Sequence, residues 1–274
     1  MYFDEEVVLD VRLNTLDKYV DYFIIVESSY THKGDRRKLK FNFEKFKKFK
    51  NKIIYLIYDK IPKAVEAITE TDNENEKTKK YIMNALYREN AQRNHIQAGL
   101  NKAEANDIIL ISDVDEIPNL SGINFNNIKE KIIMFQQDMF YYKFDLKIPE
   151  IVWVGTKACK KKNFVNPQWL RNVKDRKYSI IRFDTLFSKK KYRSIKFIKN
   201  GGWHFTNIKT PKEIEYKLKS YLHHREFDLK PLSSDQIKKI VENKVAIYNL
   251  KVDQRADKMG NGIKLTKFEF EKLP

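Results

Sequence analysis

One stretch decides the fold of this chain: Ile108-Ile109-Leu110-Ile111-Ser112-Asp113-Val114-Asp115-Glu116-Ile117-Pro118. Its four consecutive aliphatic residues, 108–111, predict a short strand that is buried on both faces. Polar and acidic residues follow this strand at once, and Pro118 closes the stretch. Ligands of open α/β sheets bind beyond the carboxyl ends of the strands, so we expect an α/β fold with a site at this strand end.

The segments upstream of this strand alternate between helical and extended patterns. We expect helices at 3–16, 36–52 and 81–100, strands at 22–26 and 53–58, and a mobile loop at 69–80. Such alternation is typical of a mostly parallel sheet with helices on both faces.

The pattern changes downstream of Pro118. Residues 132–144 and 178–187 are predicted to be β segments with no comparable helix between them, and residues 211–221 and 234–250 to be helices. No repeat and no linker rich in proline or glycine divides the chain. We therefore expect a single domain, 1–274, whose C-terminal half is more antiparallel and irregular.

The composition excludes several classes of protein. Hydrophobic residues make up 42% of the 274 residues, which is too many for a disordered chain. The single cysteine, Cys159, cannot form an internal disulfide or a cysteine-based zinc site. No apolar stretch reaches the roughly 18 residues of a membrane span, and residues 1–10 lack the pattern of a signal peptide. We expect a soluble, cytoplasmic protein.

The strong positive charge suggests an anionic partner. The chain has 54 Lys and Arg against 37 Asp and Glu, a net charge of +17, and its densest basic run is 36–52. Phe43, Phe46 and Phe49 recur in this run at a helical spacing, which favours rings packed in the core over a platform for stacking bases. No nucleic-acid module is recognisable, so an anionic membrane surface and an anionic sugar donor stay open as partners.

Asp113 and Asp115 are the strongest candidates for chemistry. Two carboxylates one residue apart, just past a buried strand, can bind the same Mg²⁺ or Mn²⁺ ion. Such an ion neutralises a departing diphosphate. From the residues alone, an ordinary solvated loop is an equally good interpretation.

Three further groups of residues stand out less strongly. Gly201-Gly202-Trp203-His204-Phe205 places a histidine, a potential metal or phosphate ligand, between two aromatic rings, although the spacing alone favours a core histidine flanked by packing aromatics. Arg88 and Arg93 lie on a predicted helix and could bind phosphate, although surface ion pairs are the commoner use of such residues. His223 and His224 lack the spacing of a zinc motif and are interpreted as structural.

Taken in order, these segments resemble glycosyltransferase family 17. The resemblance covers roughly residues 1–225 and rests on the following motifs: Phe3-Asp4-Glu5-Glu6, Asp10-Val11-Arg12-Leu13-Asn14, Val20–Ser28, Tyr30-Thr31-His32, Gly34, Arg88-Glu89-Asn90, Gln92-Arg93-Asn94, Ser112–Pro118, Trp153, Gly155-Thr156-Lys157, Arg171-Asn172 and Gly202-Trp203-His204-Phe205. The ordered combination is more specific than any one of these motifs.

The resemblance implies a GT-A-like, Rossmann-like nucleotide-sugar fold. It also implies transfer of a sugar, most specifically GlcNAc, from a UDP-sugar to a glycan or glycolipid hydroxyl with inversion at the anomeric carbon. Carried over by position, Asp113, Asp115 and His204 would bind Mn²⁺ or Mg²⁺. The donor would contact the following residues: Glu27, Ser28, Arg88, Arg93, Ser112, Asp113 and Trp203. Three carboxylates, Glu116, Asp138 and Asp145, are candidates for the catalytic base.

The same resemblance divides the domain into three parts. Residues 1–118 would bind the nucleotide-sugar, 119–225 would hold the acceptor and active-site half, and 226–274 would form a C-terminal helical extension. A peripheral contact with an anionic membrane is a possible use of the basic surface, and no specific nucleic acid is expected. A basic nucleic-acid-binding protein, or a silent glycan- or nucleotide-sugar-binding protein, is the alternative.

Overall fold

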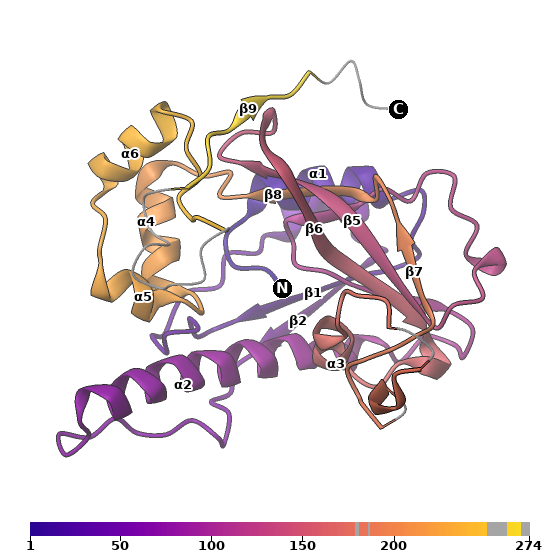
Figure 1. Ribbon diagram of the computed structural model, residues 1–274, viewed down its shortest axis with the longest axis horizontal. Helices are drawn as coiled ribbons and strands as arrows, with labels where there is room; N and C mark the ends of the chain where they lie inside the picture. The colour runs from indigo at the N-terminus through magenta and orange to yellow at the C-terminus, as the bar shows by residue number, and fades with distance from the viewer. Residues whose placement is uncertain (179–180, 186, 251–261, 270–274) are drawn as a thin grey trace.

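The computed structural model describes residues 1–178, 181–185, 187–250 and 262–269. It is a mixed α/β structure with two sheets, one of two strands and one of seven (Figure 1). Within these residues, no helix combines the length and the apolar character that crossing a membrane requires.

The N-terminal part pairs two strands in parallel. Helix α1, Glu6–Leu16, precedes β1, Phe23–Ser28, which pairs in parallel with β2, Ile53–Tyr58. All three elements were expected from the sequence, within a few residues at each end. Apolar residues at helical spacing, Leu9, Leu13 and Leu16 among them, bury one side of α1 in the core.

The basic run is a short 3₁₀ segment, η1 (Phe43–Phe49), with a kink at Phe46, and not the expected long helix. Phe46 and Phe49 are buried, as predicted, while the half-exposed Phe43 packs edge-on against Phe41. The lysines around these rings contact α1 and the turn after it: Lys45 pairs with Glu6, Lys48 bonds Asn14 and Lys52 pairs with Asp17. Part of the basic run therefore holds the N-terminal helix in place.

The seven-stranded sheet is mixed, and the expectation of a mostly parallel sheet is wrong for it. Its path is β3-β6-β5-β8-β4, with β7 beside β5 and β9 beside β6. The strands are β3 (Ile108–Ile111), β4 (Glu116–Pro118), β5 (Ile132–Tyr141), β6 (Leu146–Lys160), β7 (Ile195–Ile198), β8 (Gly202–Thr206) and β9 (Thr266–Lys267). Only β7 and β8 pair with β5 in parallel; the other pairs are antiparallel.

Helix α2, Glu74–Asn94, begins inside the segment that was expected to be a loop, 69–80. Asn73 and Glu76 form a capping box, which explains why this polar sequence is helical. The helix ends at Asn94, and a 3₁₀ turn, η2 (His95–Gly99), completes the segment that was expected to be helical up to residue 100. Figure 1 shows α2 running along one edge of the molecule beside the N-terminal strands.

The C-terminal half differs from prediction in several elements. Strands β6, β7 and β8 were missed, and so were the short helix α3, Pro167–Asn172, and the helix at His224–Leu229. The predicted β segment 178–187 includes residues outside the described ranges, and its described residues hold a 3₁₀ turn, η5 (Phe183–Thr185). The predicted helix 234–250 ends at Glu242, because α6 spans Ser234–Glu242.

Helices α4 (Pro211–Ser220), α5 (His224–Leu229) and α6 gather at one end of the molecule, on the left in Figure 1. They pack with β5 and β6 around a core of their own that includes Ile148, Ile214, Phe227 and Ile237. Two further short turns complete the connections: η3 (Phe125–Asn127) lies between β4 and β5, and η4 (Lys161–Asn163) lies between β6 and α3. Residues 251–261 and 270–274 of the predicted C-terminal extension lie outside the described residues.

Candidate active site

The residues that follow β3 face two arginines from distant parts of the chain. Asp113 forms ion pairs with Arg93 of α2, at 3.2 Å, and with Arg171 of α3, at 3.0 Å. Burial alone would raise the pKa of Asp113, but the two arginines together hold it below its usual value. Asp113 is therefore a carboxylate whose negative charge is fixed by the fold.

Glu116 lies beneath Asp113 and is almost fully buried. Its two carboxylate oxygens accept a bidentate pair of hydrogen bonds from Arg171, at 2.6 and 2.8 Å. The indole N–H of Trp153 and the backbone N–H of Asp113 donate to the same carboxylate, at 2.8 and 2.9 Å. The carboxylate of Glu116 therefore accepts from four donors. It orients Arg171 toward Asp113 and does not point into open space.

Asp115 pairs with a histidine from another strand. Its Oδ2 lies 3.5 Å from Nε2 of His204, because Glu116 on β4 sits opposite His204 on β8 in the antiparallel register. Burial favours a higher pKa for Asp115, but His204 and, to a smaller extent, Lys217 together hold the pKa below its usual value. The ring of Trp153 covers His204, with the ring centroids 5.1 Å apart.

Arg12 of α1 encloses the strand end from the other side. It donates to Oγ of Ser112 at 2.6 Å and to the backbone carbonyl of Glu116 at 2.5 Å. Burial lowers the pKa of Arg12 to about 10, although the nearby carboxylates favour its charged form. The seven residues Arg12, Arg93, Asp113, Asp115, Glu116, Arg171 and His204 are called the acidic–arginine cluster below.

One pair of side chains in the cluster, Asp115 and His204, could contribute two ligands to a cation. Asp115 and His204 present an oxygen and a nitrogen 3.5 Å apart, a separation that two ligands of one ion at about 2.1 Å each can span. The other ring nitrogen of His204, Nδ1, is buried and has no hydrogen-bond partner. Within the described residues no group of three or more His, Cys, Asp and Glu side chains could hold a metal alone. An ion there would need further oxygen ligands from a substrate or from water.

The sequence profile of glycosyltransferase family 17 matches residues 1–254. The chain belongs to this family. Two curated relatives, the human and rat proteins named β-1,4-mannosyl-glycoprotein 4-β-N-acetylglucosaminyltransferase, are each 28% identical over 121 residues.

The matched stretch covers 43% of this family 17 chain and 20% of each of these two relatives. No solved structure matches the chain. The recognition of the family from its sequence motifs is confirmed, and the α/β architecture agrees with it.

Three of the residues predicted to bind the sugar donor instead make hydrogen bonds within the protein. The buried carboxylate of Glu27 pairs with Arg37 at 3.0 Å and accepts from the backbone N–H groups of Lys40 and Phe41. Ser28 accepts from the backbone N–H of Tyr30. Arg88 donates to the backbone carbonyls of residues 32 and 33, at 3.1 and 2.9 Å. These residues shape the loop after β1, and among the described residues no hydrogen bond or ion pair joins them to the acidic–arginine cluster.

Two of the other predicted residues lie on the opposite face of the main sheet. Trp203 and Asp138 are neighbours in the parallel register of β8 and β5. Side chains alternate along a strand, so both face away from His204 and Glu116. Asp138 also pairs with Lys147 at 2.7 Å.

Asp145, the third predicted base, lies in the turn between β5 and β6, where its carbonyl accepts from Phe268. Of the base candidates, Glu116 alone belongs to the cluster, and its four donors leave it bound to the protein.

Arg171 and Arg12 are the cluster residues that sequence reasoning missed. Arg171 meets Glu116 across 55 positions of sequence, and Arg12 meets it across 104. Their segments belong to the family resemblance, but nothing local distinguishes either arginine from the many on the surface. Membership of those segments is the one signal that could have identified them.

Proposed function

We propose that this chain is an inverting, metal-dependent glycosyltransferase that moves a sugar from a UDP-sugar to a glycan hydroxyl. The observation that carries this proposal is the meeting of Asp113 and Asp115, at the end of β3, with His204 and with the paired arginines Arg93 and Arg171. The family supports the reaction class, since its name describes sugar transfer.

Each part of the acidic–arginine cluster has a place in this reaction. Asp115 and His204 would hold Mn²⁺ or Mg²⁺, and the bound ion supplies positive charge for the leaving diphosphate. Arg171 fixes Asp113 and Glu116 in one geometry, so the carboxylates do not need to reorganise when the donor binds. Arg93 joins α2 to the same point and is itself held by Glu89, at 2.7 Å.

The two named relatives favour GlcNAc as the transferred sugar. Their name specifies an N-acetylglucosaminyltransferase that acts on a mannosyl glycoprotein. We extend this to the present chain as UDP-GlcNAc for the donor and a glycan or glycolipid for the acceptor. An inverting reaction is a direct displacement, in which the acceptor oxygen bonds to the anomeric carbon as the bond to UDP breaks and a base takes the hydroxyl proton.

A panel of sugar nucleotides tests the proposal. We expect the purified protein to release UDP from UDP-GlcNAc faster than from UDP-Gal or UDP-Glc, with no release of GDP from GDP-mannose. The release should need Mn²⁺ or Mg²⁺ and should stop with EDTA. Asp115→Asn should lower it at least 100-fold, whereas Asp235→Asn, at an exposed position in the first turn of α6, should not change it.

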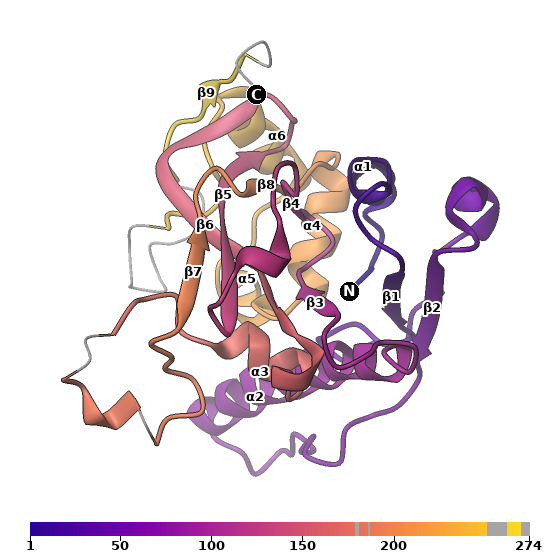
Figure 2. The same ribbon diagram turned by 90° about the vertical axis from the view of Figure 1, so that its right-hand side faces the viewer.

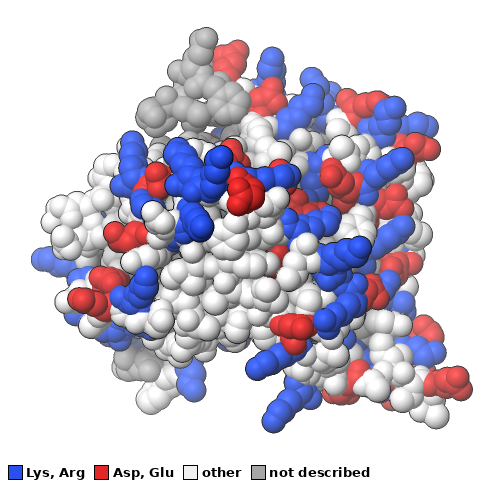
Figure 3. Space-filling view, turned by 180° about the vertical axis from the view of Figure 1, so that it is seen from behind, with Lys and Arg blue, Asp and Glu red and all other residues white. Residues whose placement is uncertain are grey.

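Two outcomes would overturn the proposal. Binding of UDP-GlcNAc by calorimetry without hydrolysis, and without transfer to any of a set of mannose-terminated glycans, would identify a silent binding protein. Tight, salt-sensitive binding of random RNA without UDP affinity would identify a nucleic-acid-binding protein. The face shown in Figure 3 does not favour the latter, because basic side chains on it are interspersed with acidic ones around a broad uncharged area.

A further inference from the structure

The loop 174–193, which connects α3 to β7, concentrates exposed apolar side chains. Among the described residues, the three large apolar side chains with the greatest exposure are Phe187, Ile181 and Phe183, at 89%, 80% and 71%. All three fall within one stretch of seven residues of this loop. Single exposed apolar residues are common on protein surfaces, but a group of them marks a surface that binds a partner.

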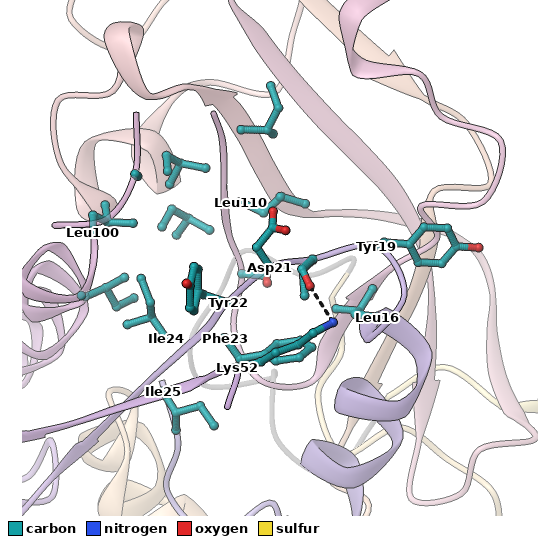
Figure 4. Close-up of a pocket in the computed structure, with 18 of the residues that line it drawn as sticks. Leu16, Tyr19, Asp21, Tyr22, Phe23, Ile24, Ile25, Lys52, Leu100 and Leu110 are labelled. Carbon is teal, nitrogen blue, oxygen red and sulfur yellow. Dashed lines mark hydrogen bonds between the residues drawn. The ribbon is translucent and has the colours of Figure 1, made fainter. Parts of the chain in front are cut away.

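Elsewhere in the molecule, apolar side chains of this size are mostly turned inward. The cavity of about 640 Å³ beside β1 is an example, since the buried Leu16, Ile25 and Leu100 line it together with charged residues such as Lys52. Figure 4 shows these side chains around the cavity, where Nζ of Lys52 donates to the backbone carbonyl of Val20 at 3.1 Å. The loop 174–193 has the opposite arrangement, with its large apolar side chains turned outward.

Polar groups of the loop bond to one another and fix the shape of its tip. Arg193 donates from Nε to Oγ1 of the buried Thr185 and from a terminal nitrogen to the carbonyl of Arg182, both at 2.7 Å. The side chain of Arg182 pairs in turn with Asp184 at 2.8 Å. These bonds hold the turn η5 in place while the ring of Phe183, its first residue, stays exposed.

The two arms of the loop meet at a neck that carries basic side chains. The backbone N–H of Lys174 donates to the carbonyl of Lys190 at 2.8 Å, and the indole N–H of Trp169 on α3 donates to the carbonyl of Lys189 at 2.9 Å. Five side chains near this neck are basic and exposed: Lys174, Arg176, Lys177, Lys189 and Lys190. Figure 2 shows the loop projecting from the molecule at the lower left, beyond β7 and α3.

We propose that the loop 174–193 docks the protein on an anionic membrane surface. Ile181, Phe183 and Phe187 would enter the interfacial region of the bilayer, and the basic neck would contact lipid phosphates. The loop contains eight Lys and Arg against two Asp, so its charge is complementary to that of anionic lipids. Apolar side chains bordered by basic ones are typical of segments that bind in the membrane interface.

Two other partners fit the loop less well. Nucleic acid would stack its bases on aromatic rings, and the aliphatic Ile181 offers none. A second copy of this chain would pair the same surface with itself, as twofold symmetry requires. That contact would bring two strongly basic loops together, at a cost in charge repulsion.

Co-sedimentation of the 274-residue protein with vesicles tests the proposal. We expect binding to phosphatidylcholine vesicles that contain roughly 30 mol% phosphatidylserine, with little binding to phosphatidylcholine alone and less binding at high salt. The double variant Phe183→Ser/Phe187→Ser should lower the partition coefficient about tenfold or more, because two apolar rings no longer enter the bilayer. The matched control, Ile61→Ser/Leu229→Ser, changes two other exposed apolar side chains and should retain the binding of the parent.

The basic neck is tested separately. Lys189→Gln/Lys190→Gln should lower binding to the anionic vesicles about tenfold, since each lysine near the surface adds to the attraction. The control Lys60→Gln/Lys63→Gln removes the same charge at exposed positions after β2 and should change binding far less. A protein with Phe187→Trp supplies a direct readout of insertion, because brominated lipid should quench its added fluorescence.

Equal partitioning of the loop variants and their controls would overturn the proposal, and so would equally tight binding to neutral and anionic vesicles. Dimerisation without vesicle binding, abolished by Phe183→Ser/Phe187→Ser, would assign the loop to a second copy of the chain. Tight binding of random RNA without vesicle binding, abolished by Lys189→Gln/Lys190→Gln, would assign it to nucleic acid. None of these measurements uses a sugar nucleotide, so membrane docking and the proposed enzyme activity can fail separately.

Discussion

Arg171 is the residue on which the candidate site depends most. Its guanidinium contacts Asp113 and both oxygens of Glu116, and it also donates to the backbone carbonyl of Gly155 at 2.6 Å. Burial disfavours its charge, but the carboxylates outweigh burial and raise its pKa. A planar group with five donors can satisfy all of these acceptors at once, and a lysine ammonium cannot.

Arg171→Lys should therefore reduce activity while it keeps the positive charge. We expect kcat to fall between 10- and 100-fold, because hydrogen bonds to charged groups contribute about 1.5–3 kcal/mol. The matched control is Arg182→Lys, at an arginine that pairs with Asp184 on the surface, where solvent screens the ion pair. Steady-state UDP release measures both variants. A kcat for Arg171→Lys within twofold of that of the control would show that the bidentate contact is dispensable.

At the scale of elements, one buried lysine anchors the C-terminal end of α3. Lys157 of β6 donates from its Nζ to the backbone carbonyls of Arg171 and Val173, at 2.7 and 2.6 Å. These carbonyls lie at the C-terminal end of α3, where no further turn of helix would bond to them. Burial lowers the pKa of Lys157 to about 8, so the group is held near the limit of its charged state. The lysine thus joins the sheet to the helix that carries Arg171.

Lys157→Met should loosen α3 and impair the site together. Two carbonyls would lose their donor, and we expect a loss of about 1–3 kcal/mol in the free energy of unfolding. Lys147→Met serves as the control, because Lys147 lies on the same strand but pairs with the half-exposed Asp138. Urea titrations measure stability, and UDP release at a concentration where the variant is folded measures function. Full stability with normal release in Lys157→Met would exclude the anchoring role.

The elements also show what the sequence could and could not predict. Strand β3 and the acidic residues after it were predicted because both signals are local and adjacent. Strand β6 was missed because Pro149 and Gly155 interrupt its apolar pattern. The start of α2 was missed because its stability comes from a capping box and not from apolar spacing. Arg171 could not be predicted from spacing, since its contact with Asp113 spans 58 positions.

Across the whole molecule, the charge of +17 describes the surroundings of the site more than its chemistry. Several basic residues bind within the protein: Arg12, Arg93 and Arg171 in the acidic–arginine cluster, Arg37 on Glu27, and Lys45 and Lys52 against α1 and the residues that follow it. Arg93 and Arg171, at the candidate site, therefore bind carboxylates of the protein itself and not an external polyanion. On the face shown in Figure 3, basic side chains lie among acidic ones.

Stability should fall as the solution is acidified, because two histidines are buried in uncharged form. Burial lowers the pKa of His224 to about 4 and also lowers that of His32. Above pH 6.5 neither the folded nor the unfolded protein binds a proton at His224, so His224 does not change the free energy of unfolding with pH in that range. Between pH 6.5 and 4 the unfolded chain is protonated first, and the free energy of unfolding should drop by about 3 kcal/mol from His224.

The variant His224→Phe should remove much of this pH dependence. Its stability at pH 7 should fall by about 1 kcal/mol, because the hydrogen bond between Nδ1 and the carbonyl of Tyr221 is lost. Between pH 6.5 and 4 it should then lose less stability than the parent protein. The neighbouring His223 is exposed, and His223→Phe should keep the parent pH profile. Urea denaturation from pH 4 to 8 measures all three proteins; parallel profiles for the parent and His224→Phe would place the acid sensitivity at other groups, with His32 the first to examine.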